Sequence, residues 1–216
     1  STVFTKIYNM TLPEKTVERL SQYRRTLIEC LAQGKTHIYS HQMAGLHHTT
    51  AVQVRRDLML IGYSSVNKKG YNVRELIDVI ESIIDHPKGL KVIVVGMGNL
   101  GRAITAYFTG KRPKLSIVAT FDVDENKVDR VIAGVKCYHI RNMQQFISEN
   151  DISIAIISSP PETAVAITEM LVLAGIKGIL NFTTTPLNVP HSVYLEEYDM
   201  ITSIEKIAYF VKGLGD

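Results

Sequence analysis

Residues 90–101 read LKVIVVGMGNLG, and they indicate the fold of the larger part of the chain. Its first six residues form a nearly continuous apolar run, as expected of a strand buried on both faces of a parallel sheet. Gly96, Gly98 and Gly101 follow at once in the spacing G-x-G-x-x-G, and the pattern over 102–108 continues as a helix. A strand, this turn and a helix in succession predict a dinucleotide-binding loop.

The loop predicts how a cofactor is held. The first glycine permits the tight turn, the second lets the backbone approach a pyrophosphate, and the third lets the helix pack on the strand. The phosphates would lie at the N-terminus of the helix. The loop residues that we expect to contact the cofactor are Gly96, Met97, Gly98, Asn99, Leu100 and Gly101.

An acid follows the next predicted strand. The apolar run 117–121 ends in Asp122, which lies 21 residues past Gly101. A carboxylate there can bind both hydroxyls of a ribose and repels a 2′-phosphate. The sequence therefore favours NADH and NAD+ over the phosphorylated dinucleotides.

The alternation of strands and helices continues to residue 182. Strands at 137–140, 152–157 and 178–182, with helices near 144–149 and 162–174, predict a right-handed βαβ series and a Rossmann-type parallel sheet. The polar residues that end the later strands are Ser158, Ser159, Asn181 and Thr183. Open α/β sheets bind ligands at this carboxyl edge, so we expect these residues near the nicotinamide, although either loop could simply turn the chain.

The N-terminal third is basic. Residues 1–74 carry 11 Lys and Arg against 4 Asp and Glu, a net charge of +7, whereas residues 75–216 carry 13 against 17, a net charge of −4. An excess of this kind favours a polyanion such as DNA, although many basic faces are only solvated.

The same third has a helical pattern. Thr11 and Glu14 fit a capping box for a long amphipathic helix that runs to Gly34. Ser40 can cap a short second helix, and Thr50 a third over about 51–61. With the short turn between them and the KKGY loop that follows, these helices predict a winged helix-turn-helix domain.

The third of these helices has the features of a DNA-recognition helix. Its predicted core face consists of Ala51, Val54, Leu58 and Ile61. Arg56 then points outward and Arg55 lies on the flank of that outward arc, which also holds Gln53. Arginine can form paired hydrogen bonds with guanine and glutamine with adenine. The alternative is that both arginines are solvated.

Other chemistry receives little support. The histidines His37, His41, His47 and His48 share no ligand-like spacing with a Cys or an acid, so we expect no metal. Cys30 and Cys137 lie far apart and are expected to be buried, reduced thiols. No apolar stretch is long enough for a membrane span and residues 1–6 lack the pattern of a signal peptide, so we expect a cytoplasmic protein.

The C-terminal region leaves little room for catalysis. A dehydrogenase needs a substrate domain and a proton relay, yet fewer than 40 residues follow the strand at 178–182, so we expect no catalytic residues. Residues 203–214 carry a narrow apolar stripe, which either packs on its own sheet or forms a dimer interface. The predicted organisation is a winged-helix domain over 1–88, a nucleotide-binding domain over 89–202 and a dimerisation helix over 203–216.

The chain resembles the Rex family of redox-sensing transcriptional repressors. The stretches that carry the resemblance are TTAVQVRRDL (49–58), KGYNV (69–73), VGMGNLGRA (95–103), FDVDENK (121–127) and AGIKGILNF (174–182). The resemblance implies a homodimer with an N-terminal winged helix, a C-terminal Rossmann domain and a last helix that swaps onto the partner. It also implies that NADH releases the protein from inverted-repeat operator DNA.

The resemblance also assigns roles to single residues. The implied DNA-binding residues are Thr50, Gln53, Arg55, Arg56, Lys69, Gly70 and Tyr71. Arg25, Tyr107 and Asp199 stand at positions that resemble the switch of the family, with Tyr107 also near the cofactor. Two stretches depart from the family: 59–61 reads MLI in place of Ser-Tyr-Phe, and 181–184 reads NFTT in place of Asn-Phe-Ala-Pro. The exact operator and the nicotinamide contacts therefore stay open.

Two other functions remain as alternatives. One is an enzyme, either a small NAD-dependent oxidoreductase or a CoA- or nucleotide-binding ligase-like subunit. The other is a DNA-binding protein whose Rossmann half only dimerises. The intact glycine loop and Asp122 argue against the second.

Overall fold

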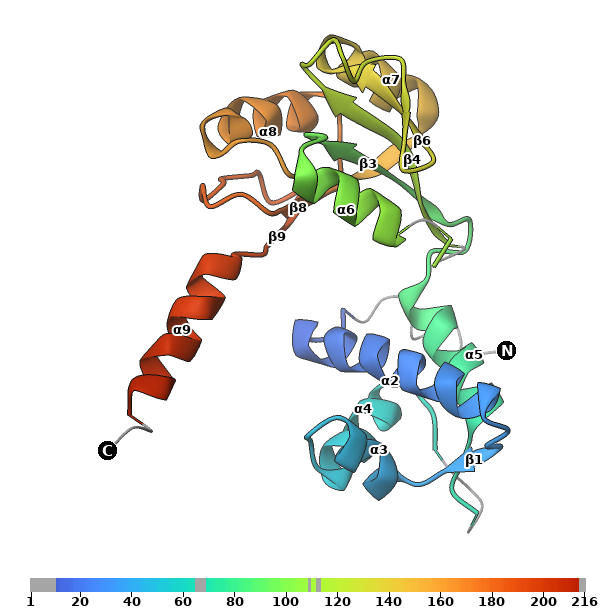
Figure 1. Cartoon of the computed structure of the whole chain (residues 1–216). Helices are drawn as coiled ribbons and strands as arrows, with labels where there is room; N and C mark the ends of the chain where they lie inside the picture. Colours follow the sequence, from blue (N-terminus) through green and yellow to red (C-terminus); the bar gives the residue numbers. More distant parts are fainter. Residues whose placement is uncertain (1–10, 65–68, 109, 112–113, 214–216) are drawn as a thin grey trace. The chain divides into compact units, whose positions relative to one another are not determined.

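The computed structural model describes residues 11–64, 69–108, 110–111 and 114–213. The chain divides into two compact units, Ser1–Pro87 and Lys88–Asp216, and each is described by itself (Figure 1). Lys68 of the KKGY loop and Leu214 at the end of the apolar stripe lie outside the described residues.

The first unit is a winged helix, as predicted. Its described elements are α2 (Glu14–Ala32), β1 (His37–Ile38), α3 (Ser40–Leu46), α4 (Ala51–Leu60), β2 (Tyr71–Asn72) and α5 (Val73–Ile84). Strands β1 and β2 pair antiparallel, with Ile38 opposite Tyr71. The turn between α3 and α4 is short (Figure 1).

One apolar core holds this unit together. Leu20, Tyr23 and Leu27 from α2 are fully buried with Val54 and Leu58 from α4. Ile61 belongs to the same cluster and Ala51 packs against it, so the predicted core face of α4 is confirmed. Helix α5 was not predicted, although its Val73, Leu76, Ile77 and Ile80 are buried at helical spacing. Its start is capped by Asn72, whose side chain accepts a hydrogen bond from the backbone of Glu75.

The predicted caps of the first unit need two corrections. Thr11 does not cap α2: Pro13 precedes the helix, and a helix begun at Leu12 would place helical backbone directly before proline, which is sterically disfavoured. Ser40 is the first residue of α3 rather than its cap, and Gln42 Oε1 accepts from the backbone N–H of Tyr39. The cap at Thr50 is confirmed, since its Oγ1 accepts from the Gln53 backbone at 3.1 Å.

The second unit is built on a mostly parallel sheet, as predicted. Its described strands are β3 (Leu90–Val95), β4 (Leu115–Asp122), β5 (Val131–Ile132), β6 (Val135–His139), β7 (Ile152–Ile157), β8 (Gly178–Asn181) and β9 (Tyr194–Glu197). They lie in the order β5-β6-β4-β3-β7-β8-β9, and only the β5–β6 pair among them is antiparallel. Strands β5 and β9 at the two edges were not predicted.

Helices cover both faces of this sheet. Ile93 and Val95 of β3 pack with residues of α7 (Met143–Asn150) and α8 (Ala164–Leu173). Val92 and Val94 point to the opposite face, where α6 (Asn99–Phe108) contributes Ile104 (Figure 1). Burial on both faces explains the continuous apolar run of β3.

Cys30 and Cys137 are free and buried, as expected.

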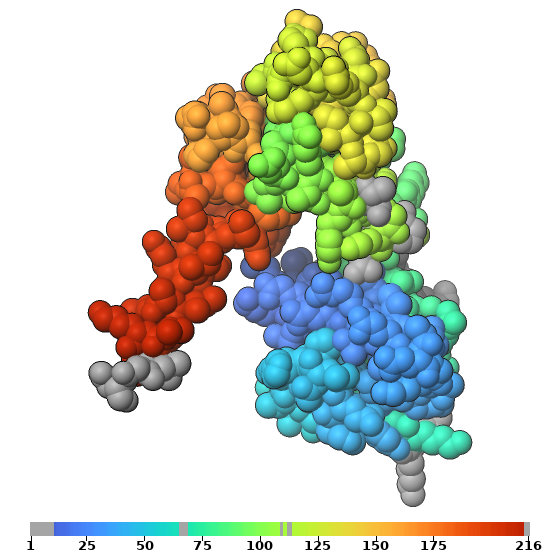
Figure 2. Space-filling model, in the orientation of Figure 1, coloured from blue at the N-terminus to red at the C-terminus, as the bar shows by residue number. Residues whose placement is uncertain are grey.

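The last described helix, α9 (Met200–Lys212), has no buried residue. It begins at Met200 rather than at Ser203, because Asp199 caps it and accepts from the backbone N–H groups of Ile201 and Thr202. Figure 2 shows this helix in red, with its side chains open on the viewed face. None of the helices in the described part combines the length and the apolar character that a bilayer span requires.

Candidate nucleotide site and DNA-binding helix

The topology of the sheet marks one point as a ligand site. From β3 the chain continues to β4 and β6 on one side, and then crosses to β7 on the other side of β3. Ligands of open α/β sheets bind at the carboxyl ends of the strands at such a switch point. The glycine loop leaves β3 here, and Ser158 directly follows β7.

The three glycines of the loop have different surroundings. A Cβ on Gly96 would lie 2.6 Å from the Ser159 backbone nitrogen, and φ at Gly96 is +97°. A Cβ on Gly101 would collide with the carbonyl oxygen of Gly96. By contrast, a Cβ on Gly98 would meet nothing within 4 Å, so the space in front of this residue is open to a ligand. This is the pattern expected of a turn that brings backbone amides to a pyrophosphate.

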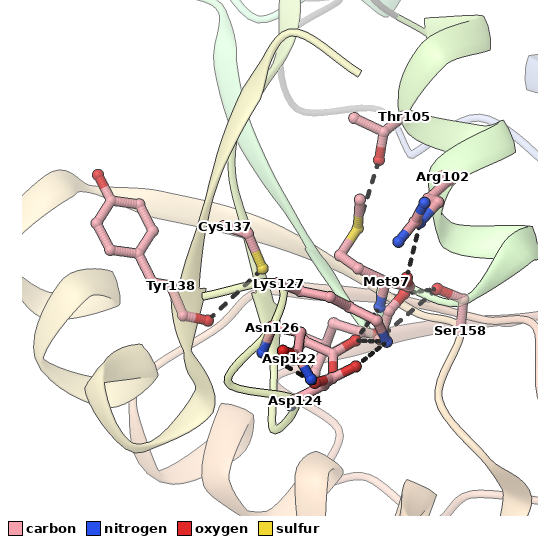
Figure 3. Close-up of polar contacts among 12 residues, drawn as sticks. Met97, Arg102, Thr105, Asp122, Asp124, Asn126, Lys127, Cys137, Tyr138 and Ser158 are labelled. Atoms are coloured by element: carbon pink, nitrogen blue, oxygen red, sulfur yellow. Dashed lines mark hydrogen bonds and ion pairs between the residues drawn. The ribbon is translucent and has the colours of Figure 1, made fainter. Parts of the chain in front are cut away.

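Asp122 lies beside this loop, at the end of β4 (Figure 3). Its Oδ2 accepts from the Met97 backbone at 2.7 Å and from Lys127 Nζ at 3.1 Å, and its Oδ1 accepts from the Asp124 backbone at 2.9 Å. Burial on its own would raise the pKa of Asp122, but these hydrogen bonds and the Lys127 charge outweigh it and lower the pKa. The group is therefore a carboxylate at neutral pH. Sequence reasoning missed Lys127, although it stands in the FDVDENK stretch.

Met97 holds the glycine loop in place through its buried side chain and its backbone hydrogen bonds. Its side chain is fully buried in the core under α6, and its N–H is used by Asp122. Its carbonyl oxygen accepts from Arg102 Nε at 3.3 Å. We therefore withdraw a side-chain contact between Met97 and a cofactor. Asn99 is exposed and Leu100 half-buried in the first turn of α6, beside the open space at Gly98.

The residues after β7 and β8 differ in what their side chains do. Ser158 is half-buried and its Oγ donates to the Gly96 carbonyl at 2.8 Å, which ties the two strand ends together. Ser159 is half-buried beside it. Asn181 and Thr183 are buried: Asn181 Oδ1 accepts from the backbone and the Oγ1 of Thr183, and its Nδ2 donates to the Thr185 carbonyl. These two side chains hold their own turn, which is the alternative that the sequence left open.

The three residues of the expected switch occupy different places. Tyr107 is in the last turn of α6, 68% exposed, with Lys111 Nζ 3.2 Å from its ring centroid. It lies about 12 Å along the helix axis from Asn99, so the fold does not bring it to the glycine loop of its own chain. Asp199 caps α9, and Arg25 is exposed on α2 in the first unit.

In the first unit, α4 presents a mixed surface. Arg55 and Arg56 are exposed, as are Val52 and Met59. Arg55 Nη1 donates to Ser40 Oγ at 3.1 Å, which links α4 to the start of α3. Cationic and apolar side chains on one helix are suited to guanine edges and thymine methyl groups.

The wing contains one correction. Gly70 has φ of +90°, and a Cβ there would lie 2.7 Å from the Ile38 carbonyl oxygen, so the wing needs a glycine at this position. Lys69 is exposed beside it. Tyr71, however, is only 8% exposed and packs in the core, because its position in β2 directs the ring inward. We therefore remove the Tyr71 side chain from the candidate DNA contacts.

Sequence reasoning also missed a buried carboxylate on α4. Asp57 is fully buried, at 0% exposure. Its Oδ1 accepts from Arg19 Nη2 at 2.8 Å and from Gln53 Nε2 at 2.9 Å. Its Oδ2 accepts from Arg19 Nε at 2.6 Å and from the Tyr23 hydroxyl at 3.0 Å. An acid inside an otherwise basic helix, four residues after a glutamine, was the available signal.

No metal centre is found in the described part of the chain, where no three His, Cys, Asp or Glu side chains are grouped to hold an ion. His47 instead packs edge-to-face on Tyr23 and forms a hydrogen bond with Thr26. Burial, together with the charge of Arg25, lowers its pKa, which favours the neutral imidazole.

Comparisons with known proteins cover both units. Residues 11–58 match the family model of a putative DNA-binding protein N-terminus, and residues 87–185 match that of a CoA binding domain. The redox-sensing transcriptional repressor Rex of Geobacillus kaustophilus (strain HTA426) is 35% identical over 202 residues, which cover 94% of this chain and 94% of that protein.

Two solved structures are similar over almost the whole chain. The structure of RSP in complex with beta-NAD+ and operator DNA has a TM-score of 0.87 and 30% identity, and the match covers 95% of this chain and 94% of that chain. The structure of RSP in complex with beta-NADH has a TM-score of 0.82 and 30% identity, and covers 95% and 96%.

Proposed function

This chain belongs to the Rex family of redox-sensing transcriptional repressors, and from that premise we propose how it acts. It represses transcription by binding operator DNA, and NADH releases it. The observation that carries the proposal is the open space at Gly98 next to the Asp122 carboxylate, in the same chain as a winged helix. RSP, which is a Rex-family repressor, has been crystallised with operator DNA and with both oxidation states of the dinucleotide.

Membership of this family excludes the two enzyme functions that the sequence left open. Its members are transcriptional repressors, so the chain is neither an oxidoreductase nor a ligase-like subunit. The match to a CoA binding domain is consistent with this, because a Rossmann-type fold is shared by proteins of unrelated function. The nucleotide-binding half is a sensor and not a catalyst.

For the cofactor, we assign the contacts from the loop outward. The pyrophosphate lies against the backbone of Gly98, Asn99 and Leu100, where the first turn of α6 offers free N–H groups. Asp122 accepts from the adenosine ribose. The nicotinamide lies toward Ser158 and Ser159, with the backbone of the turn around Thr183 at its edge. The half-buried state of both serines supports this assignment.

For DNA, α4 enters the major groove and the wing contacts the backbone. Arg56 and Gln53 read base edges, whereas Arg55, Thr50 and Lys69 contact phosphates or support the helix. The exposed guanidinium groups and the basic charge of residues 1–74 support this orientation.

We assign three functional segments and a homodimer. Residues 1–88 bind DNA, residues 89–202 bind NADH or NAD+, and residues 203–216 dimerise by exchange onto a second copy. The uncovered apolar side chains of α9 support the exchange, and an inverted-repeat operator requires two recognition helices. Arg25, Tyr107 and Asp199 act as the switch between the segments. We place the protein in the cytoplasm, where operator DNA and the NADH pool are accessible.

The experiment is an operator titration with and without NADH. Fluorescence anisotropy with an inverted-repeat duplex at fixed salt should show tight binding without NADH, and a fall in affinity of roughly 5- to 150-fold with it. NAD+ at the same concentration is the control for ionic strength and for nonspecific nucleotide effects. Operator binding that NADH leaves unchanged would contradict the sensor, and binding to no duplex would contradict the repressor.

A further inference from the structure

The amide of Gln53 has two ends of opposite hydrogen-bonding character, and Asp57 determines which end it uses. A carboxylate only accepts hydrogen bonds, so it can pair with the NH2 end of an amide and not with its oxygen. Gln53 Nε2 donates to Asp57 Oδ1 at 2.9 Å. The orientation of this amide is therefore fixed by chemistry as well as by its position on the helix.

Asp57, the anchor of the Gln53 amide, is itself held firmly. Arg19 pairs with both oxygens of Asp57 through Nε and Nη2, and this forked contact leaves the carboxylate little freedom to rotate. Burial would raise the pKa of Asp57, but the hydrogen bonds from Arg19, Gln53 and Tyr23 outweigh it and lower the pKa. Asp57 thus remains an acceptor at neutral pH.

We infer that Asp57 is a positioning residue for operator recognition: it holds the NH2 end of Gln53, so that the amide oxygen is presented to DNA. Gln53 then selects a base that carries an amino group in the major groove, which is adenine or cytosine, over guanine and thymine, which offer only oxygen at that place. The inference rests on the proposed function, because it requires α4 to bind DNA. It adds a residue that touches no DNA but sets what its neighbour reads.

The test uses a set of operators in which each base pair of the half-site is replaced in turn. Gln53→Ala should lose the preference for one base pair by roughly 2- to 12-fold, the value of the single hydrogen bond that the free amide oxygen can form. Asp57→Asn should lose preference at that same base pair, because an asparagine can both donate and accept and no longer fixes the amide. In the Gln53→Ala background, Asp57→Asn should change no preference further, since the two residues act as one unit.

A matched control separates positioning from general damage. Tyr23→Phe removes a hydrogen bond to Oδ2 of Asp57 and leaves the contact between Gln53 and Oδ1 in place. This variant should keep the preference of the parent at every base pair. The salt dependence of binding should be unchanged in all of these variants, because none removes a phosphate contact.

Two results would overturn the inference. One is that Asp57→Asn keeps the full base preference of the parent. The other is that Asp57→Asn loses affinity by the same factor for every operator in the set. If Asp57→Asn does not fold, NMR of the parent decides: a slowly exchanging Gln53 side-chain amide proton supports the anchor, and exchange as fast as that of an exposed glutamine contradicts it. A parent that binds no operator contradicts the proposed function, whereas the NMR result still tests the anchor by itself.

Discussion

The two units each contain a buried carboxylate, and the two differ in what surrounds them. Asp57 is fully buried and is held by side chains of α2 and α4, chiefly by the guanidinium group of Arg19. Asp122 is 8% exposed and is held by backbone N–H groups and by Lys127. Both have a lowered pKa, so the pKa alone does not tell a structural carboxylate from a ligand site.

The kind of donor makes the distinction. A forked arginine pair fixes both oxygens of Asp57 in a closed core, where a ligand cannot enter. The lysine at Asp122 is a single point charge on a flexible stem, and the carboxylate accepts from the backbone of Met97, the residue before Gly98. Asp57 therefore holds parts of the protein together, whereas we propose that Asp122 binds a ribose.

Removal of the buried carboxylate of Asp57 should strongly lower the free energy of unfolding of the first unit. Asp57→Ala leaves Arg19 and the Tyr23 hydroxyl without their partner, and breaking a buried pair costs about 3 to 5 kcal/mol. The Arg19 side chain is 24% exposed, so water can reach it and we expect a loss near the lower end of that range. Urea unfolding followed by circular dichroism measures the loss, and NADH binding by the second unit should persist.

The matched control for Asp57 is an exposed acid on α2. Glu18 pairs with Lys15 at the surface, so Glu18→Ala should change the free energy of unfolding by less than about 0.5 kcal/mol. An Asp57→Ala variant as stable as the Glu18→Ala variant would contradict the reading of Asp57 as the organising carboxylate.

Removal of the other carboxylate should instead affect binding. Asp122→Ala should weaken NADH binding by roughly 10- to 150-fold, because hydrogen bonds to a charged group contribute about 1.5 to 3 kcal/mol. Operator binding should stay close to that of the parent. Calorimetric titration with NADH measures the effect. Asp124→Ala is the control, since Asp124 also faces Lys127, at 3.6 Å, but is more exposed. Equal NADH affinity in the parent and in Asp122→Ala would remove Asp122 from the site.

Two glycines of the loop differ in the same way: Gly101 packs against the protein, whereas Gly98 faces the space proposed for the ligand. Gly101→Ala places a methyl group against the carbonyl of Gly96 and should destabilise the second unit by about 1 to 3 kcal/mol. Gly98→Ala meets no neighbour, so it should leave stability within about 0.5 kcal/mol of the parent and weaken NADH binding. Thermal unfolding and calorimetry of both variants test this. Normal NADH affinity in Gly98→Ala would show that the open space is not where the pyrophosphate lies.

The difference between the two carboxylates also explains what the sequence could predict. The position of Asp122 beside the glycine loop could be predicted because its strand, loop and helix follow one another in the chain, so the motif is local. Asp57 was missed because Arg19 is 38 residues away, and only the folded core brings the two together. Spacing along the chain does not report such a pairing.

Other misses have similar physical causes. Strand β9 reads YLEE, which lacks the apolar run of a buried strand because it lies at the sheet edge. The place of Asn181 and Thr183 near the nicotinamide stays a prediction, but the sequence could not reveal that their side chains bond each other, because the direction of a side chain in a turn depends on local hydrogen bonds. Tyr71 reads as an exposed wing residue, and only the pairing of β1 with β2 shows that it faces the core.

A third carboxylate, Asp199, gives the smallest and most specific prediction. It accepts from backbone N–H groups at the start of α9 and from Thr202 Oγ1, so it serves as a cap. The proposed switch requires its charge, whereas a cap requires only an acceptor. Asp199→Asn keeps an acceptor of nearly equal capping strength and removes the charge, and Asp199→Ala removes both.

The readout is the ratio of NADH affinities measured with and without saturating operator. Linkage requires that operator DNA weaken NADH binding by the same factor by which NADH weakens operator binding. If the charge of Asp199 carries part of the coupling, both variants should shrink that ratio by a similar factor while the NADH affinity of the free protein stays unchanged. A ratio that falls in Asp199→Ala and not in Asp199→Asn would assign the effect to the cap of α9. Equal affinities with and without operator in the parent would exclude the NADH switch as a whole.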